Sequence, residues 1–433
     1  MNSTKLIKLF RKTLRNSSPS DYINKNIKFK NNILFIKNKE FKIEKNISII
    51  AFGKASLSMF KGLKDVLGIK NIENALIISH LEKLPKNSKK IKYLKSSHPY
   101  VSIKSLEAGK EIYKFVSNLN ENNKLIVLVS GGGSAMISYP IKEISFRQKK
   151  LFLSQLLTSG TPEREVNTIR KSLSRIKGGG LADATRCKEI INLILSDERS
   201  HKFDAISSGP TVYSRGIDPF HIIKKYNLSK LIPKNIISFY KNFDINKVRG
   251  DKKKIYNYLV GSRDNFISDF SKELLNNNVN KVFQLKNEFN NDAYLFASRL
   301  RKKYNKIYDN LPKGNYIVLS SGEIQVKVTN LKRSRKGGRN QHLVANMMLQ
   351  EPFNFPFMFF ALASDGQDFI NGVSGAYYSN SHINIIKKKM NKLSDNIKNF
   401  NTFKFHKDIK TLVKSKKTGH NVSDIFIFYF QKI

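Results

Sequence analysis

The chain has 433 residues, a formal net charge of +45 and a single cysteine, Cys187. Its length allows two or three domains with buried cores, and a hydrophobic content of 40% excludes wholesale disorder. One cysteine excludes an internal disulfide and is typical of a reducing compartment, so we expect a cytoplasmic protein. No apolar run reaches the length of a membrane span, so no membrane partner is expected.

The lysines that produce the charge are spread along the whole chain, among asparagine and isoleucine. Only short clusters stand out, such as Lys387 to Lys389 and Lys414 to Lys417. No RNA-recognition or zinc-finger pattern accompanies them. We therefore expect no specific nucleic-acid partner, although the positive charge should attract small anionic molecules.

The predicted elements begin with a basic segment, residues 1–20, whose Leu6, Ile7, Phe10 and Leu14 share one helical face. This pattern favours an amphipathic helix, with an organelle transit peptide as the other interpretation. A short hairpin or a pair of loops is expected over residues 33–43. Buried strands are then expected at 47–52, 75–79, 125–129, 190–195, 256–261, 316–320, 357–363 and 425–430, and helices at 102–119, 148–157, 164–176, 181–186, 265–275 and 292–304.

Strands that alternate with helices and end in small or polar residues predict an α/β fold with a mostly parallel sheet. The polar, irregular stretch from about residue 227 to 254 predicts a boundary. We expect a Rossmann-like domain over residues 1–240, with helices on both faces of its sheet, and a smaller α/β domain over residues 255–433.

A glycine-rich turn follows the strand at 125–129 and reads Ser130, Gly131, Gly132, Gly133 and Ser134. Glycine lets the backbone turn sharply and point successive N–H groups into one concavity, and Ser134 can cap the helix that follows. The turn can therefore hold a phosphate or carboxylate. An ordinary strand-to-helix turn is the equally good alternative.

Two charged residues follow predicted strands in the same way. Lys54 comes after the strand at 47–52, and Asp197 comes after the strand at 190–195. Because ligands of parallel α/β sheets bind beyond the carboxyl ends of the strands, these residues should lie near the glycine-rich turn. Composition alone would make Lys54 one more solvated lysine.

Motifs along nearly the whole chain resemble those of the glycerate 2-kinase family with a MOFRL-type C-terminal domain. They are, in order, Gly53-Lys54-Ala55, Ser97-His98-Pro99, Ser130 to Ala135, Asn167-x-x-Arg170, Leu173-Ser174-x-x-Lys177-Gly178-Gly179, Ser196-Asp197, Ser208 to Thr211, Gly322-Glu323, Gly337 to Gln341, Ser364 to Gly366, and Thr418-Gly419-x-Asn421-Val422-x-Asp424. The resemblance implies an ATP-dependent kinase that phosphorylates D-glycerate at its 2-hydroxyl, giving 2-phosphoglycerate and ADP. It also implies Mg²⁺ and a cleft between two α/β domains.

The resemblance assigns roles to particular residues. Lys54 would neutralise the transferring phosphoryl group, Asp365 would accept the hydroxyl proton, and Arg339 would hold a carboxylate or phosphate. Asp197 and Glu323 would hold Mg²⁺ directly or through water. Nucleotide, phosphate or substrate binding is expected of Ser130, Gly131, Gly132, Gly133, Ser134, Asn167, Arg170, Lys177, Gly178, Gly179, Asn340 and Gln341.

Structural roles compete with these assignments. Asp365 precedes Gly366 and can simply form a turn, and Arg339 follows a basic loop that can be solvated. Asp197 and Glu323 can be helix caps or ion-pair partners. Asn167 and Arg170 share a helical face and can support the glycine turn after them.

Three segments depart from the family pattern. Glu198 to His201 replace a Val-x-Gly-Asp pattern, His342 stands where an acidic residue is usual, and Phe369 stands where a glycine is usual. These changes leave the exact hydroxy acid and the turnover open. One alternative is an oxidoreductase of hydroxypyruvate or 2-hydroxy acids, for which the required Gly-x-Gly-x-x-Gly unit is missing. The other is a catalytically weak family member that binds a polyanion or a protein partner. The chain is expected to be a monomer or homodimer.

Overall fold

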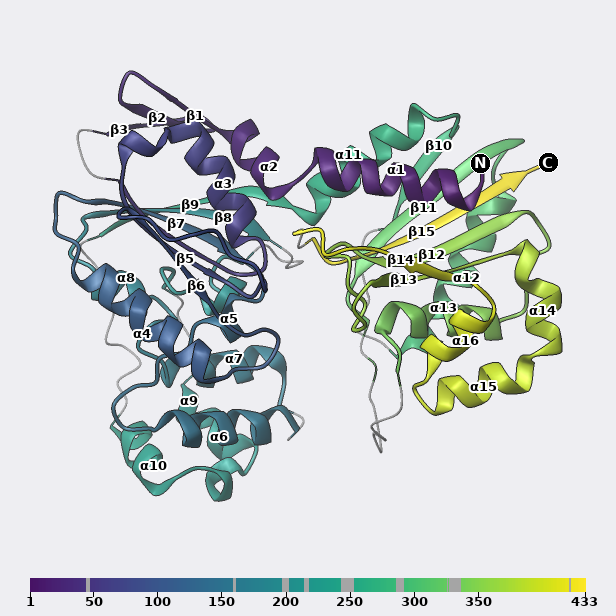
Figure 1. Cartoon of the computed structure of the whole chain (residues 1–433). Coiled ribbons are helices and arrows are strands. Elements are labelled where there is room, and N and C mark those ends of the chain that lie inside the picture. The colour runs from purple at the N-terminus through teal and green to yellow at the C-terminus, as the bar shows by residue number, and fades with distance from the viewer. Residues whose placement is uncertain are drawn as a thin grey trace. The chain divides into compact units, whose positions relative to one another are not determined.

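The computed structural model describes residues 1–43, 47–158, 161–196, 202–213, 218–242, 253–285, 292–324, 326, 336–419 and 422–433 (Figure 1). They form two compact units. One is residues 19–262, and the other combines residues 1–18 with residues 263–433. We call them the 19–262 unit and the C-terminal unit.

A six-stranded, wholly parallel sheet forms the centre of the 19–262 unit. In spatial order its strands are β6 (Ile91–Lys95), β5 (Ile72–Ser79), β4 (Ile47–Phe52), β7 (Lys124–Ser130), β8 (Glu189–Ser196) and β9 (Lys254–Ser262). The strands predicted at 47–52, 75–79, 125–129 and 190–195 are four of these. The predicted parallel α/β sheet is therefore confirmed.

Helices cover both faces of this sheet because successive strand residues point to opposite sides. Ile49 packs with Met59 of α3 on one face, and Ile50 packs with Ile112 of α4 on the other. The helices of this unit are α2 (Pro19–Asn26), α3 (Ser56–Leu67), α4 (Ile103–Ser117), α5 (Gly133–Met136), α6 (Phe146–Thr158), α7 (Glu163–Ser172), α8 (Gly180–Ala184), α9 (Pro219–Lys225) and α10 (Lys234–Lys241).

Two local predictions meet different outcomes here. The hairpin is confirmed, since β2 (Ile33–Ile36) pairs antiparallel with β3 (Lys39–Lys42), and β1 (Ile27–Lys30) completes a small sheet. The helix predicted over 164–176 is too long. It ends at Ser172 because the next residues pair elsewhere, with Ser174 bridging to Pro140 and the Arg175 N–H donating to the Tyr139 carbonyl.

The C-terminal unit is built on a mixed six-stranded sheet. Its order is β10 (Lys281–Gln284), β11 (Gly314–Gly322), β15 (Asp424–Lys432), β12 (Phe357–Ala363), β13 (Val373–Ser379) and β14 (Leu412–Lys414). Only β10 and β11 run parallel among these described pairs, and the other neighbours are antiparallel. The strands expected at 316–320, 357–363 and 425–430 lie side by side in its centre.

Helices cover both faces of this second sheet as well (Figure 1). On one face, Phe10 of α1 packs edge-on against Phe266 and Phe270 of α11, with ring centroids 5.8 and 5.7 Å apart. The opposite face carries α12, α13, α15 and α16. The helices of this unit are α1 (Ser3–Asn16), α11 (Arg263–Leu275), α12 (Ala293–Asp309), α13 (Arg339–Leu349), α14 (Ile383–Lys388), α15 (Met390–Lys398) and α16 (Thr402–Asp408).

The limits of the two units differ from the predicted domains at two places. The amphipathic N-terminal helix is confirmed as α1, but its apolar face packs on the C-terminal sheet rather than within residues 1–240. Strand β9, expected to begin the second domain, pairs in parallel with β8 and completes the first sheet. Both differences arise from contacts between segments far apart in the sequence, side-chain packing for α1 and strand pairing for β9.

Two further predictions concern membrane spans and the single cysteine. No helix in the part of the chain that the structure describes is long and apolar enough to cross a membrane. The Cys187 thiol is buried in the core of the 19–262 unit, and this burial raises its pKa. A buried, protonated thiol acts as a small packing residue.

Two histidines are buried in the C-terminal unit. Nε2 of His406 lies 2.8 Å from the Gln341 carbonyl, so it donates there, and Nδ1 lies 2.8 Å from the Thr411 hydroxyl. His342, on α13, stacks on the Phe400 ring. Burial lowers the pKa of each imidazole to about 4.

Acid should therefore destabilise the C-terminal unit. Unfolded histidine binds a proton near pH 6.5, so the stability present above that pH is lost as the pH falls toward 4. The full loss is roughly 3 kcal/mol for each histidine. Urea unfolding followed by circular dichroism at pH 7 and pH 4.5 measures it. His342→Phe should weaken the pH dependence, and replacing the exposed His221 should not; equal slopes in all three proteins would contradict the assignment.

Candidate active site

The first cluster of predicted site residues lies where the strand order of the 19–262 unit reverses. From β4 the chain moves through β5 to β6 at one edge, then returns to β7 beside β4 and continues to β8 and β9. The loops after β4 and β7 therefore leave the sheet as neighbours. In doubly wound sheets, ligands bind at this reversal, beyond the carboxyl ends of the strands.

Lys54 follows β4 and is bound directly to the glycine-rich turn after β7. Its N–H donates to the Gly131 carbonyl at 2.9 Å, and the next N–H, of Ala55, donates to the Ser130 hydroxyl at 3.0 Å. The backbones approach so closely that a Cβ on Gly53 would lie 2.3 Å from the Ser130 hydroxyl oxygen. The structure thus brings Lys54 and the turn together, as their positions at strand ends predict.

The turn itself has the conformation that glycine permits. Gly132 has a φ of 83°, and a Cβ there would lie 2.9 Å from Nε2 of His98 and 3.1 Å from Cγ of Lys54. Gly132 directly precedes the short helix α5. The side chains of Lys54 and His98 therefore lie against the segment that the sequence predicts as an anion site.

A second loop, which the sequence analysis did not include among the site residues, completes this cluster. The Ser207 hydroxyl donates to the Ser130 carbonyl at 2.7 Å, and the Ser208 hydroxyl lies 2.7 Å from that of Ser134. Ser207 and Ser208 are non-glycine residues with positive φ, 53° and 63°. The signal available in the sequence was the Ser208-Gly209-Pro210-Thr211 motif, which indicated a turn without indicating its partner.

The glycine turn at residues 177–179 lies against the same loop. The Gly178 N–H donates to the Ser208 carbonyl at 3.0 Å, and the buried Lys177 amine donates to the Ser134 carbonyl at 3.0 Å. On α7, Nη1 of Arg170 donates to the Asn167 amide oxygen at 2.7 Å, so these two residues share a helical face as predicted.

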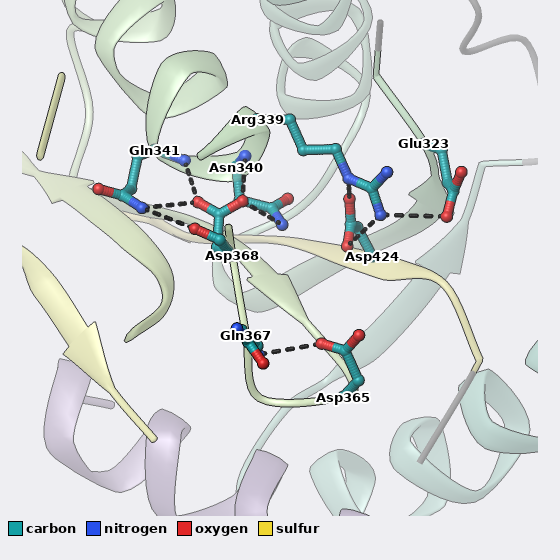
Figure 2. Close-up of polar contacts among 8 residues, drawn as sticks. All are labelled: Glu323, Arg339, Asn340, Gln341, Asp365, Gln367, Asp368 and Asp424. Carbon is teal, nitrogen blue, oxygen red and sulfur yellow. Dashed lines mark hydrogen bonds and ion pairs between the residues drawn. The ribbon is translucent and has the colours of Figure 1, made fainter. Parts of the chain in front are cut away.

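A second cluster, in the C-terminal unit, surrounds Arg339 at the start of α13 (Figure 2). Nε and Nη2 of its guanidinium donate to the two carboxylate oxygens of Asp424, and Nη2 also donates to Glu323 at 3.0 Å. Within the described residues, Nη1 has no hydrogen-bond partner. Asp424 is 1% exposed and Glu323 is 57% exposed at its side chain, so Asp424 is the buried anchor.

Burial raises the pKa of Asp424 to about 6, although the Arg339 charge lowers it. In the sequence, Asp424 is the last residue of the Thr418-to-Asp424 motif, and no role is predicted for it. Its partner is 85 residues away, and no local pattern reveals the pair.

Asn340 and Gln341 are fully buried and surround another carboxylate, Asp368 (Figure 2). Asp368 accepts the backbone N–H groups of Asn340 and Gln341 at 3.0 and 2.9 Å, and the Gln341 side-chain amide at 3.0 Å. It therefore satisfies the first N–H groups of α13 from another segment of the chain. In this conformation the two side chains stabilise the loop beside Arg339, and ligand binding by them stays a prediction.

Asp365 follows β12 and is half-buried. Its carboxylate accepts the Gln367 N–H at 2.9 Å, which is the hydrogen bond of a turn (Figure 2). The Thr418 N–H donates to the Asp365 carbonyl at 3.0 Å and attaches this turn to the segment that leads to Asp424. Asp365 therefore forms a turn, as its structural interpretation predicts. Its role as a catalytic base stays a prediction.

Of the two predicted metal ligands, only Glu323 lies within the described residues. Asp197 lies outside the described residues, and Glu323 is occupied by Arg339. In the described parts of the chain, no three His, Cys, Asp or Glu residues form a group able to hold a metal ion. Of the three departures from the family pattern, residues 198–201 also lie outside the described residues, His342 is buried, and Phe369 is exposed.

These features define a class of protein: a two-unit α/β enzyme with a lysine and a glycine-rich turn at the reversal of a parallel sheet. Residues 5–241 match the model of a domain of unknown function, DUF4147, and residues 316–424 match the MOFRL family. The chain belongs to the glycerate kinase family that carries a MOFRL C-terminal domain, a family of small-molecule kinases.

Relatives of known name match along almost the whole chain. A glycerate 2-kinase of Picrophilus torridus is 29% identical over 99% of this chain and 96% of its own length. A D-glycerate 2-kinase of Thermotoga maritima is 25% identical over 88% of this chain and 90% of its own. The crystal structure of a glycerate kinase from Thermotoga maritima has the same fold, with a TM-score of 0.80, 22% identity, and coverage of 98% and 99% of the two chains.

Phe369 offers a test of the loop after Asp365. It is 77% exposed and has a φ of 61°, where glycine is usual in the family pattern. We expect Phe369→Gly to be more stable than Phe369→Ala by about 1 kcal/mol, because only alanine pays the cost of a left-handed backbone. Urea unfolding followed by circular dichroism measures the difference. An alanine variant equal to or more stable than the glycine variant would contradict the observed backbone conformation.

Proposed function

We propose that the protein transfers the γ-phosphoryl group of ATP to the 2-hydroxyl of D-glycerate, giving 2-phosphoglycerate and ADP, in the cytoplasm. The bond between the γ-phosphorus and the ADP oxygen breaks, a bond from the glycerate oxygen to that phosphorus forms, and the hydroxyl proton leaves to a base. The names of the relatives support the substrates. The observation that carries the proposal is the contact of Lys54 with the glycine-rich turn at the strand reversal.

The 19–262 unit supplies groups that bind anions. Phosphoryl transfer depends mainly on positioning and on neutralising charge at the transferring group. Lys54 would supply a cation to that group, and the N–H groups of the turn from Gly131 to Ser134 would bind phosphate or carboxylate oxygens. Ser207 and Ser208 would keep the turn in place through the hydrogen bonds described above.

The C-terminal unit supplies a base and a cation. Asp365 would accept the proton of the 2-hydroxyl. Asp424 and Glu323 orient the Arg339 guanidinium through Nε and Nη2, so that Nη1 would be the donor available to an oxyanion. Mg²⁺ enters the proposal as part of the MgATP substrate, and Asp197 and Glu323 stay its proposed ligands.

The proposal predicts that the protein, D-glycerate and MgATP together form 2-phosphoglycerate, detected by coupling to enolase. Lys54→Met and Asp365→Asn should each lower kcat by about 10²- to 10⁴-fold, because each removes a group needed in the transition state. Lys61→Met, which changes an exposed lysine on α3, should not. Wild-type rates in both variants would refute the roles. Reduction of hydroxypyruvate by NADH without use of ATP would refute the reaction.

The pair of Asp424 and Arg339 makes a separate prediction. Asp424→Asn should lower kcat/KM by about 10²-fold, because loss of the buried anchor lets the guanidinium move from its position. Glu323→Gln removes an exposed partner and should cost less than about tenfold. In the wild type, protonation of Asp424 should reduce kcat/KM as the pH falls through about 6, its pKa. A larger loss in Glu323→Gln than in Asp424→Asn would show that the anchor is misassigned.

A further inference from the structure

Two lysines of the 19–262 unit are buried and have no acidic partner among its described residues. Lys149, on α6, and Lys177, at the glycine turn after α7, are each 2% exposed. The Lys149 amine donates to the Leu173 carbonyl at 2.7 Å, and the Lys177 amine donates to the Ser134 carbonyl at 3.0 Å. No other partner of either amine is found among the described residues, and an ammonium group has three donors.

A third cation lies close to both. Arg170, on α7, is near enough to repel the charges of Lys149 and Lys177, and this repulsion adds to burial in lowering the pKa of both amines, that of Lys149 to about 7. We call Lys149, Arg170 and Lys177 the cation cluster. Keeping Lys149 or Lys177 charged in this buried place is costly, because a charge taken out of water needs compensation.

The position of the cation cluster indicates which kind of ion would neutralise its positive charge. Through Ser134, Lys177 is joined directly to the glycine-rich turn that follows β7. Buried cations of this kind favour an oxyanion, whether carboxylate or phosphate. The chain-wide excess of lysine does not account for the cluster, since lysine is almost never fully buried unless it is paired.

We propose that the cation cluster binds an oxyanion and that Lys149, which no motif identifies, is one of its binding residues. The proposal deepens the proposed function, because it rests on the substrates of that reaction as the source of the anion. Those sources are the carboxylate of the hydroxy acid and the phosphate groups of ATP. They share the same chemistry, and the experiment below separates them.

Sulfate is a suitable probe, because it has no titratable proton near neutral pH. The melting temperature of the full chain is compared in sodium sulfate and in sodium chloride of equal ionic strength. Sulfate should raise it in the wild type and in Lys150→Met, an exposed neighbour on α6, and should have little effect in Lys149→Met. An equal sulfate response in Lys149→Met, or none in the wild type, overturns the proposal.

The ion-free proteins give a second readout. If Lys149 is kept for an anion, Lys149→Met should melt at the same temperature as the wild type or higher, because an uncompensated buried charge is replaced by an apolar chain of similar length. If the lysine is kept only to bind the Leu173 carbonyl, the variant should melt lower or fail to fold, which overturns the proposal. Lys149→Arg keeps the cation and should restore the sulfate response in part.

Kinetics identify the source of the anion. A KM for D-glycerate raised about tenfold or more in Lys149→Met, with an unchanged KM for ATP, assigns the cluster to the carboxylate, and the reverse assigns it to phosphate. If the wild type phosphorylates glycerate but Lys149→Met keeps both KM values and the sulfate response, the cluster proposal fails and the proposed function stands. If sulfate binding depends on Lys149 but no glycerate is phosphorylated, the proposed function fails and the cluster stands.

Discussion

The close approach of two backbone turns at the ends of β4 and β7 is the constraint on which the 19–262 unit depends. The turns contact through Gly53 and the Ser130 hydroxyl, at a separation that excludes a Cβ. This approach is possible only because the strand order reverses there and makes β4 and β7 neighbours. Two further groups bind the turn after β7: the Ser207 hydroxyl donates to the Ser130 carbonyl, and the Lys177 amine donates to the Ser134 carbonyl.

The C-terminal unit solves a similar problem with carboxylates instead of glycines. A helix that begins in a loop leaves its first N–H groups without partners, and here Asp368 accepts them from a separate segment. Asp424 meanwhile binds the side chain of the first helical residue, Arg339. The start of α13 is therefore fixed at both backbone and side chain by two acids that are close to it only in the fold. Rigidity of this kind suits the role proposed for Arg339, which is to present one donor to an oxyanion.

How much could be predicted from the sequence depended on whether a signal was local. Strands at 47–52 and 125–129 were visible as apolar runs, and the parallel arrangement placed Lys54 beside the glycine-rich turn. The partners of α1 and β9 were not visible, because an amphipathic face shows that something covers it without showing what does. The pairing of Asp424 with Arg339 and the capping by Asp368 could not be predicted either. An aspartate in a sequence gives no sign of whether its carboxylate is solvated, caps a helix or forms an ion pair.

Exposed and buried lysines in this protein need separate explanations, and a function is proposed for the buried ones. The net charge of +45 comes mainly from lysines that can stay in water at little cost, and a general excess of lysine in the sequence accounts for them. Lys149 and Lys177 cannot be explained in this way, because a burial cost selects against lysine wherever an apolar side chain of the same length would fit. Both are buried, and Lys177 binds the turn that follows β7, which supports the proposal that they are kept for an interaction with an anion. A lysine-rich composition therefore conceals the informative lysines in the sequence, and only burial in the folded chain distinguishes them.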